Sequence, residues 1–146
     1  MFLNWKKEAI NDLCLYLQRK EALDNIRYRI ALLESQFISL KSISMDTPVM
    51  GGTSMQEEKL LSNISERERL QANLKIVEEL VKLTEKGLNV LESRERKILE
   101  GFYFERLDNR VERLCERFHL EKTRLYEIKD GALRKFTVAM YGTVEI

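Results

Sequence analysis

The chain has 146 residues, which is enough for one or two small domains with a modest hydrophobic core. Hydrophobic residues make up 44% of it and charged residues 34%, while a single proline and six glycines favour long helices. The net charge of +1 gives no overall basic signal for nucleic acid, so a surface for DNA must come from how the charges are distributed.

The types and spacing of the reactive residues exclude several classes of protein. Cys14 and Cys115 lie far apart without a CxxC pair, which excludes a zinc finger and argues against a disulfide framework. The sequence holds no metal-ligand cluster, no nucleophile beside a base and no glycine-rich loop after a strand, so we expect neither enzymatic activity nor a cofactor. The absence of a signal peptide and of a membrane-spanning segment predicts a cytoplasmic protein.

Residues 2–43 have the pattern of one long amphipathic helix. Apolar residues recur at alternating steps of three and four, which is the heptad pattern of a coiled coil. The heptad positions are Leu23, Ile26, Ile30, Leu33, Phe37 and Leu40. Trp5, Ile10, Leu13 and Leu17 form a less regular apolar face before them. A helix of this length extends about 60 Å, which is too long for a compact domain of this size to cover.

A loop over residues 44–54 separates this helix from a second one. The segment holds the only proline and a Gly-Gly pair, which mark a reversal of the chain. Ser54 then begins the second helix, with Glu57 as its capping-box partner three residues later. The apolar stripe of this helix consists of Leu60, Leu61, Ile64, Leu70, Leu74, Val77, Val81, Leu88 and Leu91, with Thr84 at a skipped position.

Three short helices are predicted after these two long ones. Their expected bounds are 94–103, with Glu92 or Ser93 as the cap, 110–118, and Lys122 onward. The last two are joined by about three residues, which is the helix-turn-helix pattern. The second helix of that pattern is the one that enters the major groove of DNA.

We therefore expect an all-α fold with two domains. Two long amphipathic helices joined by a short loop predict an antiparallel hairpin, or coiled coil, over residues 1–90. Residues 91–146 are expected to form the three-helix domain that carries the helix-turn-helix. Gly87 is expected to loosen the junction between the two.

Several motifs within residues 91–136 occur in a specific combination. They are Leu91 with Arg94-Glu95, Phe102-Tyr103, Leu114-Cys115-Glu116-Arg117-Phe118, and Ala132-Leu133-Arg134-Lys135-Phe136. In this order they resemble region four of bacterial primary sigma factors, which reads the −35 promoter element. The layout of the whole chain is similar to small phage regulators of the ArpU/RinA type, which are associated with late-gene activation in phages of Gram-positive bacteria.

The resemblance implies a base-reading surface at the start of the second helix of the pair. Its residues are Lys122, Thr123, Arg124, Tyr126 and Glu127, on the face opposite Leu125, Ile128 and Ala132. Arg and Lys can pair with guanine O6 and N7, and Glu can accept a hydrogen bond from cytosine N4. The alternative is a solvated helix face, which would also be charged.

Candidates for phosphate contact lie around this surface. They are Arg110, Arg113, Lys129 and Arg134. Such contacts position a protein on the duplex without specifying sequence. Arg134 and Lys135 can equally pair with Asp130 or solvate the surface. Cys115 takes the place of a small core residue, and His119 stands in the turn, where a left-handed backbone conformation is expected.

The function expected from these features is that of a sequence-specific DNA-binding transcriptional regulator. The resemblance implies a phage late-gene activator that acts with host RNA polymerase in the bacterial cytosol. The chain has no room for sigma region two, so it is not expected to be an initiating sigma subunit. Its partners would be double-stranded DNA and a second copy of the chain. The alternative is a coiled-coil adaptor that mimics region four and binds RNA polymerase or a sigma factor without reading DNA.

Overall fold

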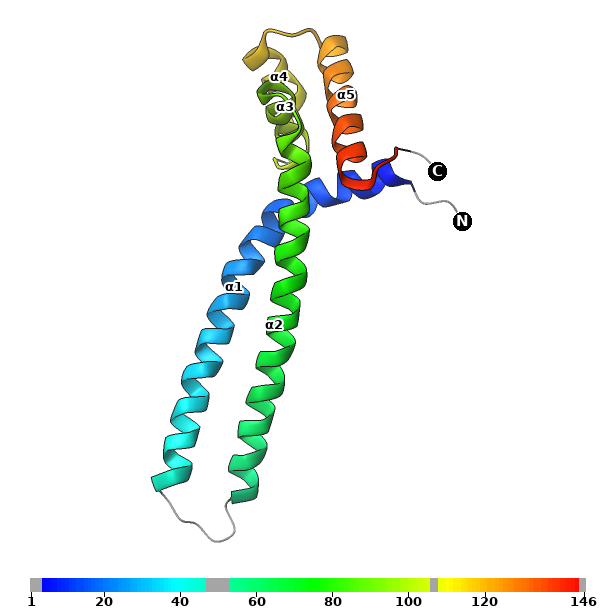
Figure 1. The fold of residues 1–146 in the computed structure, drawn as a ribbon. Helices are drawn as coiled ribbons and strands as arrows, with labels where there is room; N and C mark the ends of the chain where they lie inside the picture. Colours follow the sequence, from blue (N-terminus) through cyan, green and yellow to red (C-terminus); the bar gives the residue numbers. More distant parts are fainter. Residues whose placement is uncertain (1–3, 47–52, 106–107, 145–146) are drawn as a thin grey trace. The chain divides into compact units, whose positions relative to one another are not determined.

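The structure of the chain is a computed structural model that describes residues 4–46, 53–105 and 108–144. Over these residues it consists of five α-helices and contains no strand, which confirms the all-α prediction (Figure 1). The helices are α1 (Trp5–Asp46), α2 (Thr53–Asn89), α3 (Ser93–Tyr103), α4 (Arg110–Phe118) and α5 (Lys122–Tyr141).

Both long helices extend into the segment that the sequence predicts to be a loop. Helix α1 continues to Asp46 and α2 begins at Thr53, so both ends of the predicted loop 44–54 are helical. No proline or glycine stands before Pro48 to end α1 earlier. The centre of the predicted loop lies outside the described residues, and so does the side chain of the predicted cap Ser54.

The chain divides into two compact units. The first unit comprises residues 1–19 and 80–146, and the second comprises residues 20–79. The first unit therefore includes the beginning of α1 and the end of α2, which the sequence assigned to the hairpin. The predicted boundary between residues 90 and 91 passes through the first unit.

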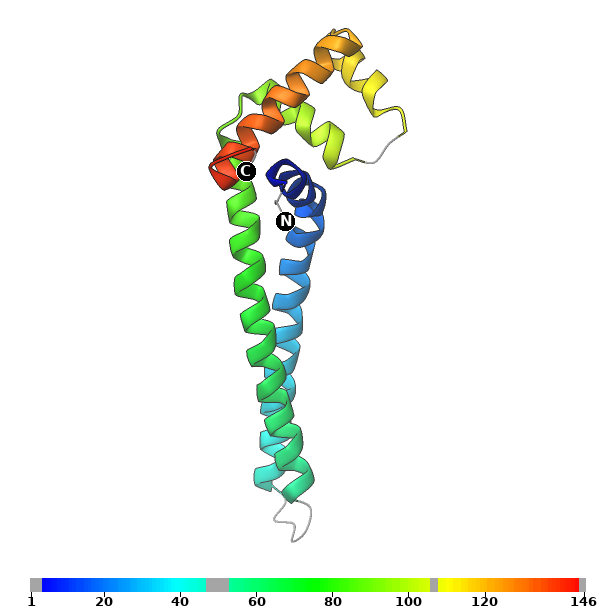
Figure 2. The ribbon, with the colours of Figure 1, turned by 90° about the vertical axis from the view of Figure 1, so that its right-hand side faces the viewer.

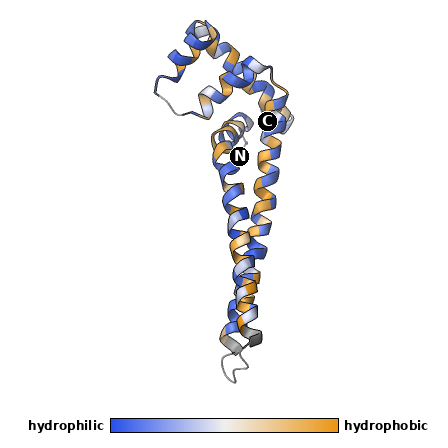
Figure 3. Ribbon diagram, turned by 90° about the vertical axis from the view of Figure 1, so that its left-hand side faces the viewer, coloured by the Kyte–Doolittle hydropathy of each residue, from blue (hydrophilic) through white to orange (hydrophobic). Residues whose placement is uncertain are grey.

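In the second unit, α1 and α2 run antiparallel beside one another (Figures 1 and 2). The Arg27 guanidinium lies 3.1 Å from the Glu78 carboxylate on the facing helix. Asn63 donates a hydrogen bond to the carbonyl of Leu33 at 2.8 Å. Hydrophobic and hydrophilic residues are interspersed along both helices (Figure 3). The predicted heptad positions of α1 are its less exposed ones.

One predicted position of the α2 stripe is wrong. The Leu61 side chain is 63% exposed, whereas the polar residue Asn63 is buried. The heptad register that begins at Leu70 extends back through Arg67, Asn63 and Leu60, and Leu61 lies outside it. The seam between the two helices is therefore partly polar in this part of α2.

The core of the first unit joins α1 and α2 to α3 and α5. Its largest buried cluster consists of Ala9, Leu13, Leu88, Leu91, Leu99, Ala132, Leu133 and Phe136. Gly87 contributes to this packing, because a Cβ atom there would lie 2.7 Å from the Phe136 ring. Gly87 was expected to loosen the junction, but in the structure it allows α5 to approach α2 closely.

Polar and aromatic contacts also fasten the start of α1 within the first unit. Trp5 stacks on Tyr141 with ring centroids 4.9 Å apart, and the Tyr141 hydroxyl donates to Asp12. Tyr16 donates a hydrogen bond to Glu85 at 2.7 Å. Burial and this hydrogen bond raise the pKa of Tyr16 to about 12. These contacts connect α1 with α2 and with the end of α5.

Candidate nucleic-acid interface

The turn between α4 and α5 depends on a residue in the left-handed conformation. His119 has φ 54° and ψ 46°, and among the described residues it is the only one other than glycine with positive φ. The N–H of Leu120 donates to the carbonyl of Cys115 at 3.0 Å, and Glu121 is extended before α5 begins. The predicted conformation of His119 is confirmed, and it lets one helix end and the next begin within three residues.

A second buried cluster fixes α4 and α5 against α3. It consists of Ile98, Phe102, Leu114, Leu125 and Ile128. Cys115 is partly buried and packs against this cluster. Because Leu125 and Ile128 point into the cluster, Glu127 between them on α5 faces away from it, while the Tyr126 ring packs at its edge against Phe102.

All five residues predicted to read bases are solvent-exposed. They are Lys122, Thr123, Arg124, Tyr126 and Glu127. The Arg124 and Glu127 side chains form an ion pair along α5, with Nη1 of the arginine 3.1 Å from Oε2 of the glutamate. Their exposure is what a base-reading surface requires, whereas their contact with DNA stays a prediction.

A cluster of rings and cations lies beside this surface. The Phe102 and Tyr126 rings have centroids 5.7 Å apart. The Lys129 ammonium lies 5.5 Å from the first centroid and 5.4 Å from the second, and its side chain is only 17% exposed. Lys129 is therefore held among partners within the protein, including Asp130 at 2.9 Å, rather than extended into solvent.

The other candidates for phosphate contact have different surroundings. Arg110 is half-buried and donates to the carbonyl of Phe102 at 3.0 Å. Arg113 and Arg134 are exposed. Lys135 donates to Glu95 at 2.9 Å, which is a different acid from the predicted partner Asp130. Arg113 and Arg134 are thus the two candidates best placed to reach a phosphate.

The Glu95–Lys135 pair joins α3 to α5 and changes the titration of the carboxylate. Burial raises the pKa of Glu95, but hydrogen bonds from Lys135 and from the backbone N–H of Glu92 outweigh it, so the pKa lies below its ordinary value. The same hydrogen bond from the Glu92 N–H to the Glu95 carboxylate completes a capping box at the start of α3, where the sequence predicts a cap.

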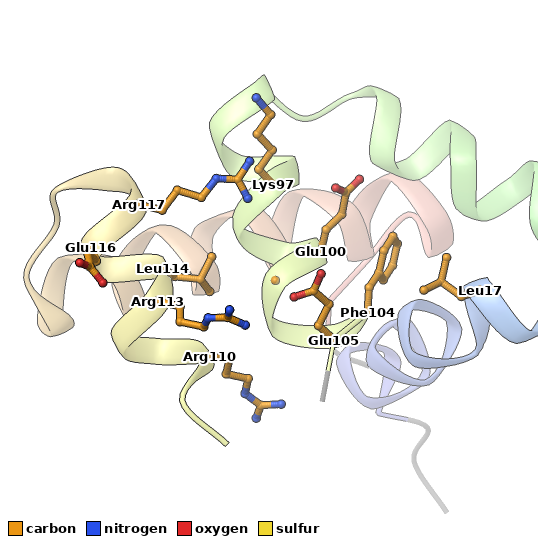
Figure 4. Close-up of a pocket in the computed structure, with 11 residues that line it drawn as sticks. Leu17, Lys97, Glu100, Phe104, Glu105, Arg110, Arg113, Leu114, Glu116 and Arg117 are labelled. Carbon is orange, nitrogen blue, oxygen red and sulfur yellow. The ribbon is translucent and has the colours of Figure 1, made fainter. Parts of the chain in front are cut away.

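A groove of about 720 Å³ lies within the first unit and is lined mainly by α3 and α4 (Figure 4). Its apolar residues are Leu17, Phe104 and Leu114. Its charged residues are Lys97, Glu100, Glu105, Arg110, Arg113, Glu116 and Arg117. Arg110 and Arg113 are among the predicted phosphate contacts, whereas Lys97 and Arg117 are not. The i, i+4 spacing of Arg113 and Arg117 on one helix is the signal that could have found the second arginine.

Comparison of the chain with protein-family models, curated proteins and solved structures finds no match. In the part of the chain that the structure describes, no group of three or more His, Cys, Asp or Glu residues could hold a metal ion. None of the described helices is both long enough and apolar enough to cross a membrane.

Proposed function

We propose that the protein is a sequence-specific DNA-binding transcriptional regulator whose helix α5 enters the major groove. The observation that carries the proposal is the exposed polar start of α5, which follows α4 through a three-residue turn at His119. Base contacts in helix-turn-helix proteins come from the N-terminal residues of this second helix. Lys122, Thr123 and Arg124 occupy that position.

In this proposal the two long helices form an antiparallel coiled coil that joins two copies of the chain or contacts a partner protein. A dimer would present two α5 helices, and its target would contain two half-sites about one helical turn apart. The resemblance to ArpU/RinA-type phage regulators supports late-gene activation with host RNA polymerase, in the bacterial cytosol.

Gel shifts with the full chain test the proposal. We expect binding to duplexes from the DNA around the gene to weaken steeply between about 50 and 200 mM salt, because phosphate contacts release counterions. Changing Lys122 and Arg124 together to alanine should weaken binding about thirtyfold or more, because base contacts of this kind contribute about 1–3 kcal/mol each. Lys6→Ala with Lys7→Ala removes the same charge from exposed positions of α1 and serves as the control. Equal binding by both double variants would contradict the proposal.

A second candidate function is that of an adaptor that mimics sigma region four without reading DNA. The groove between α3 and α4 favours it, because apolar residues surrounded by charges of both signs suit a protein segment. An adaptor should bind purified RNA polymerase or a sigma factor directly. It should also bind DNA weakly, with no preference among fragments.

A further inference from the structure

The exposed face of α5 carries an ion pair among the residues proposed to read bases. Arg124 and Glu127 stand three positions apart, which places their side chains on adjacent turns of one face. The two charged groups are 3.1 Å apart, and each side chain is 59% exposed. In the structure, Arg124 thus lies beside a carboxylate on the surface that would meet the duplex.

This pair has little to do with the stability of the fold. Ion pairs between exposed side chains contribute only about 0–1 kcal/mol to stability. Both residues lie on the face of α5 opposite the buried Leu125 and Ile128, so neither supports the core. The effect of the pair is therefore on the groups that Arg124 can bind.

The carboxylate affects two kinds of arginine contact differently. A phosphate attracts any cation, and a neighbouring carboxylate cancels much of that attraction. A guanine edge instead presents two acceptors, O6 and N7, in a fixed arrangement. A guanidinium has five N–H donors, so one bond to Glu127 leaves enough of them for both acceptors.

Resting on the proposed function, we propose that Glu127 is a specificity-determining residue that acts through Arg124. Glu127 lowers the affinity of Arg124 for backbone phosphates but leaves the affinity of Arg124 for a guanine edge in the major groove unchanged. In this role Glu127 weakens binding to duplexes that Arg124 would hold through their phosphates, and so widens the difference in affinity between the target and other sequences. Its effect requires the Arg124 side chain.

The experiment compares dissociation constants for two duplexes. The full chain first selects a duplex from a random pool, and a shuffled duplex of the same composition serves as the non-specific probe. Glu127→Gln should strengthen binding to the shuffled duplex more than to the selected one, so that the ratio of the two constants falls about fivefold or more. Glu121→Gln removes the same charge next to α5, where its side chain makes no capping hydrogen bond, and should leave the ratio unchanged.

The Arg124→Ala background provides the decisive arm. There, Glu127→Gln should leave the ratio unchanged, because the residue through which Glu127 acts is missing. A fall in the ratio that persists in this background means that Glu127 reads a base itself, which overturns the inference. An unchanged ratio for Glu127→Gln in the otherwise unaltered chain also overturns it. If the pool yields no preferred duplex, the proposed function fails, and the inference fails with it.

Discussion

At the scale of single residues, the environment of Lys129 distinguishes it from the other cations of α5. Its ammonium lies over the Phe102 and Tyr126 rings, where a partly desolvated cation–π contact contributes about 0.5–2 kcal/mol. We expect Lys129→Ala to lower the free energy of unfolding by about 1–2 kcal/mol in chemical denaturation. Arg134→Ala is the matched control, since it removes an exposed cation from the same helix. Equal losses for the two variants would show that the rings do not hold Lys129.

The Glu95–Lys135 pair makes the stability of the protein depend on pH. Because the folded pKa of Glu95 lies below its ordinary value, the stabilisation is complete above about pH 5 and is lost as the pH falls through the folded pKa. We expect Glu95→Gln to destabilise the chain at pH 7 but to make it less sensitive to acid, measured as the midpoint of thermal unfolding between about pH 3 and 7. Glu112→Gln removes an exposed carboxylate from α4 and should leave the acid dependence almost unchanged.

At the scale of helices, two glycines have opposite surroundings. A Cβ atom at Gly131 would meet nothing within 4 Å, whereas one at Gly87 would lie 2.7 Å from the rigid ring of Phe136. Gly131→Ala should therefore stabilise the chain by about 1 kcal/mol through helix propensity. Gly87→Ala should gain the same helix propensity, but it should destabilise the chain overall, because overpacking costs about 1–3 kcal/mol in a close-packed core. Thermal unfolding should show midpoint shifts of opposite sign, and two upward shifts would contradict the packing at Gly87.

The helices themselves were predictable because their signals are local. Heptad spacing, the cap at Glu92 or Ser93 and the tolerance of His119 for positive φ are all signals that lie within a few residues of the feature they determine. The candidate base-reading residues follow from the same local periodicity, since Leu125 and Ile128 fix which face of α5 is buried.

The packing of the first turns of α1 was not predictable from local spacing. Ala9 and Leu13 are fully buried, whereas Leu17, which the apolar pattern placed on the same face, is 48% exposed. Which residues of α1 are buried is determined by packing against α2 and α5, whose residues lie far away in the sequence. The orientation of Lys129 was missed for the same reason, because Phe102 belongs to a different helix.

At the scale of the whole chain, the buried cluster of the first unit implies that residues 91–146 do not fold alone. Ala9, Leu13 and Leu88 cover the faces of α3 and α5 that carry Leu99 and Phe136. A fragment over residues 91–146 would expose that surface and retain only the smaller cluster around Phe102. We expect it to show reduced helix content by circular dichroism and no cooperative thermal transition, although it contains the entire helix-turn-helix.

Two changes in the full chain separate this prediction from a general effect of shortening. Leu13→Ala should destabilise the first unit by about 2–5 kcal/mol, because a fully buried leucine is lost. Leu17→Ala removes an exposed leucine one turn later on α1 and should cost much less. The fluorescence of Trp5, the only tryptophan, reports on the contact with Tyr141 as the unit unfolds. If the fragment melts cooperatively near the midpoint of the full chain, and Leu13→Ala costs no more than Leu17→Ala, then α3 to α5 form a domain of their own and α1 merely covers it.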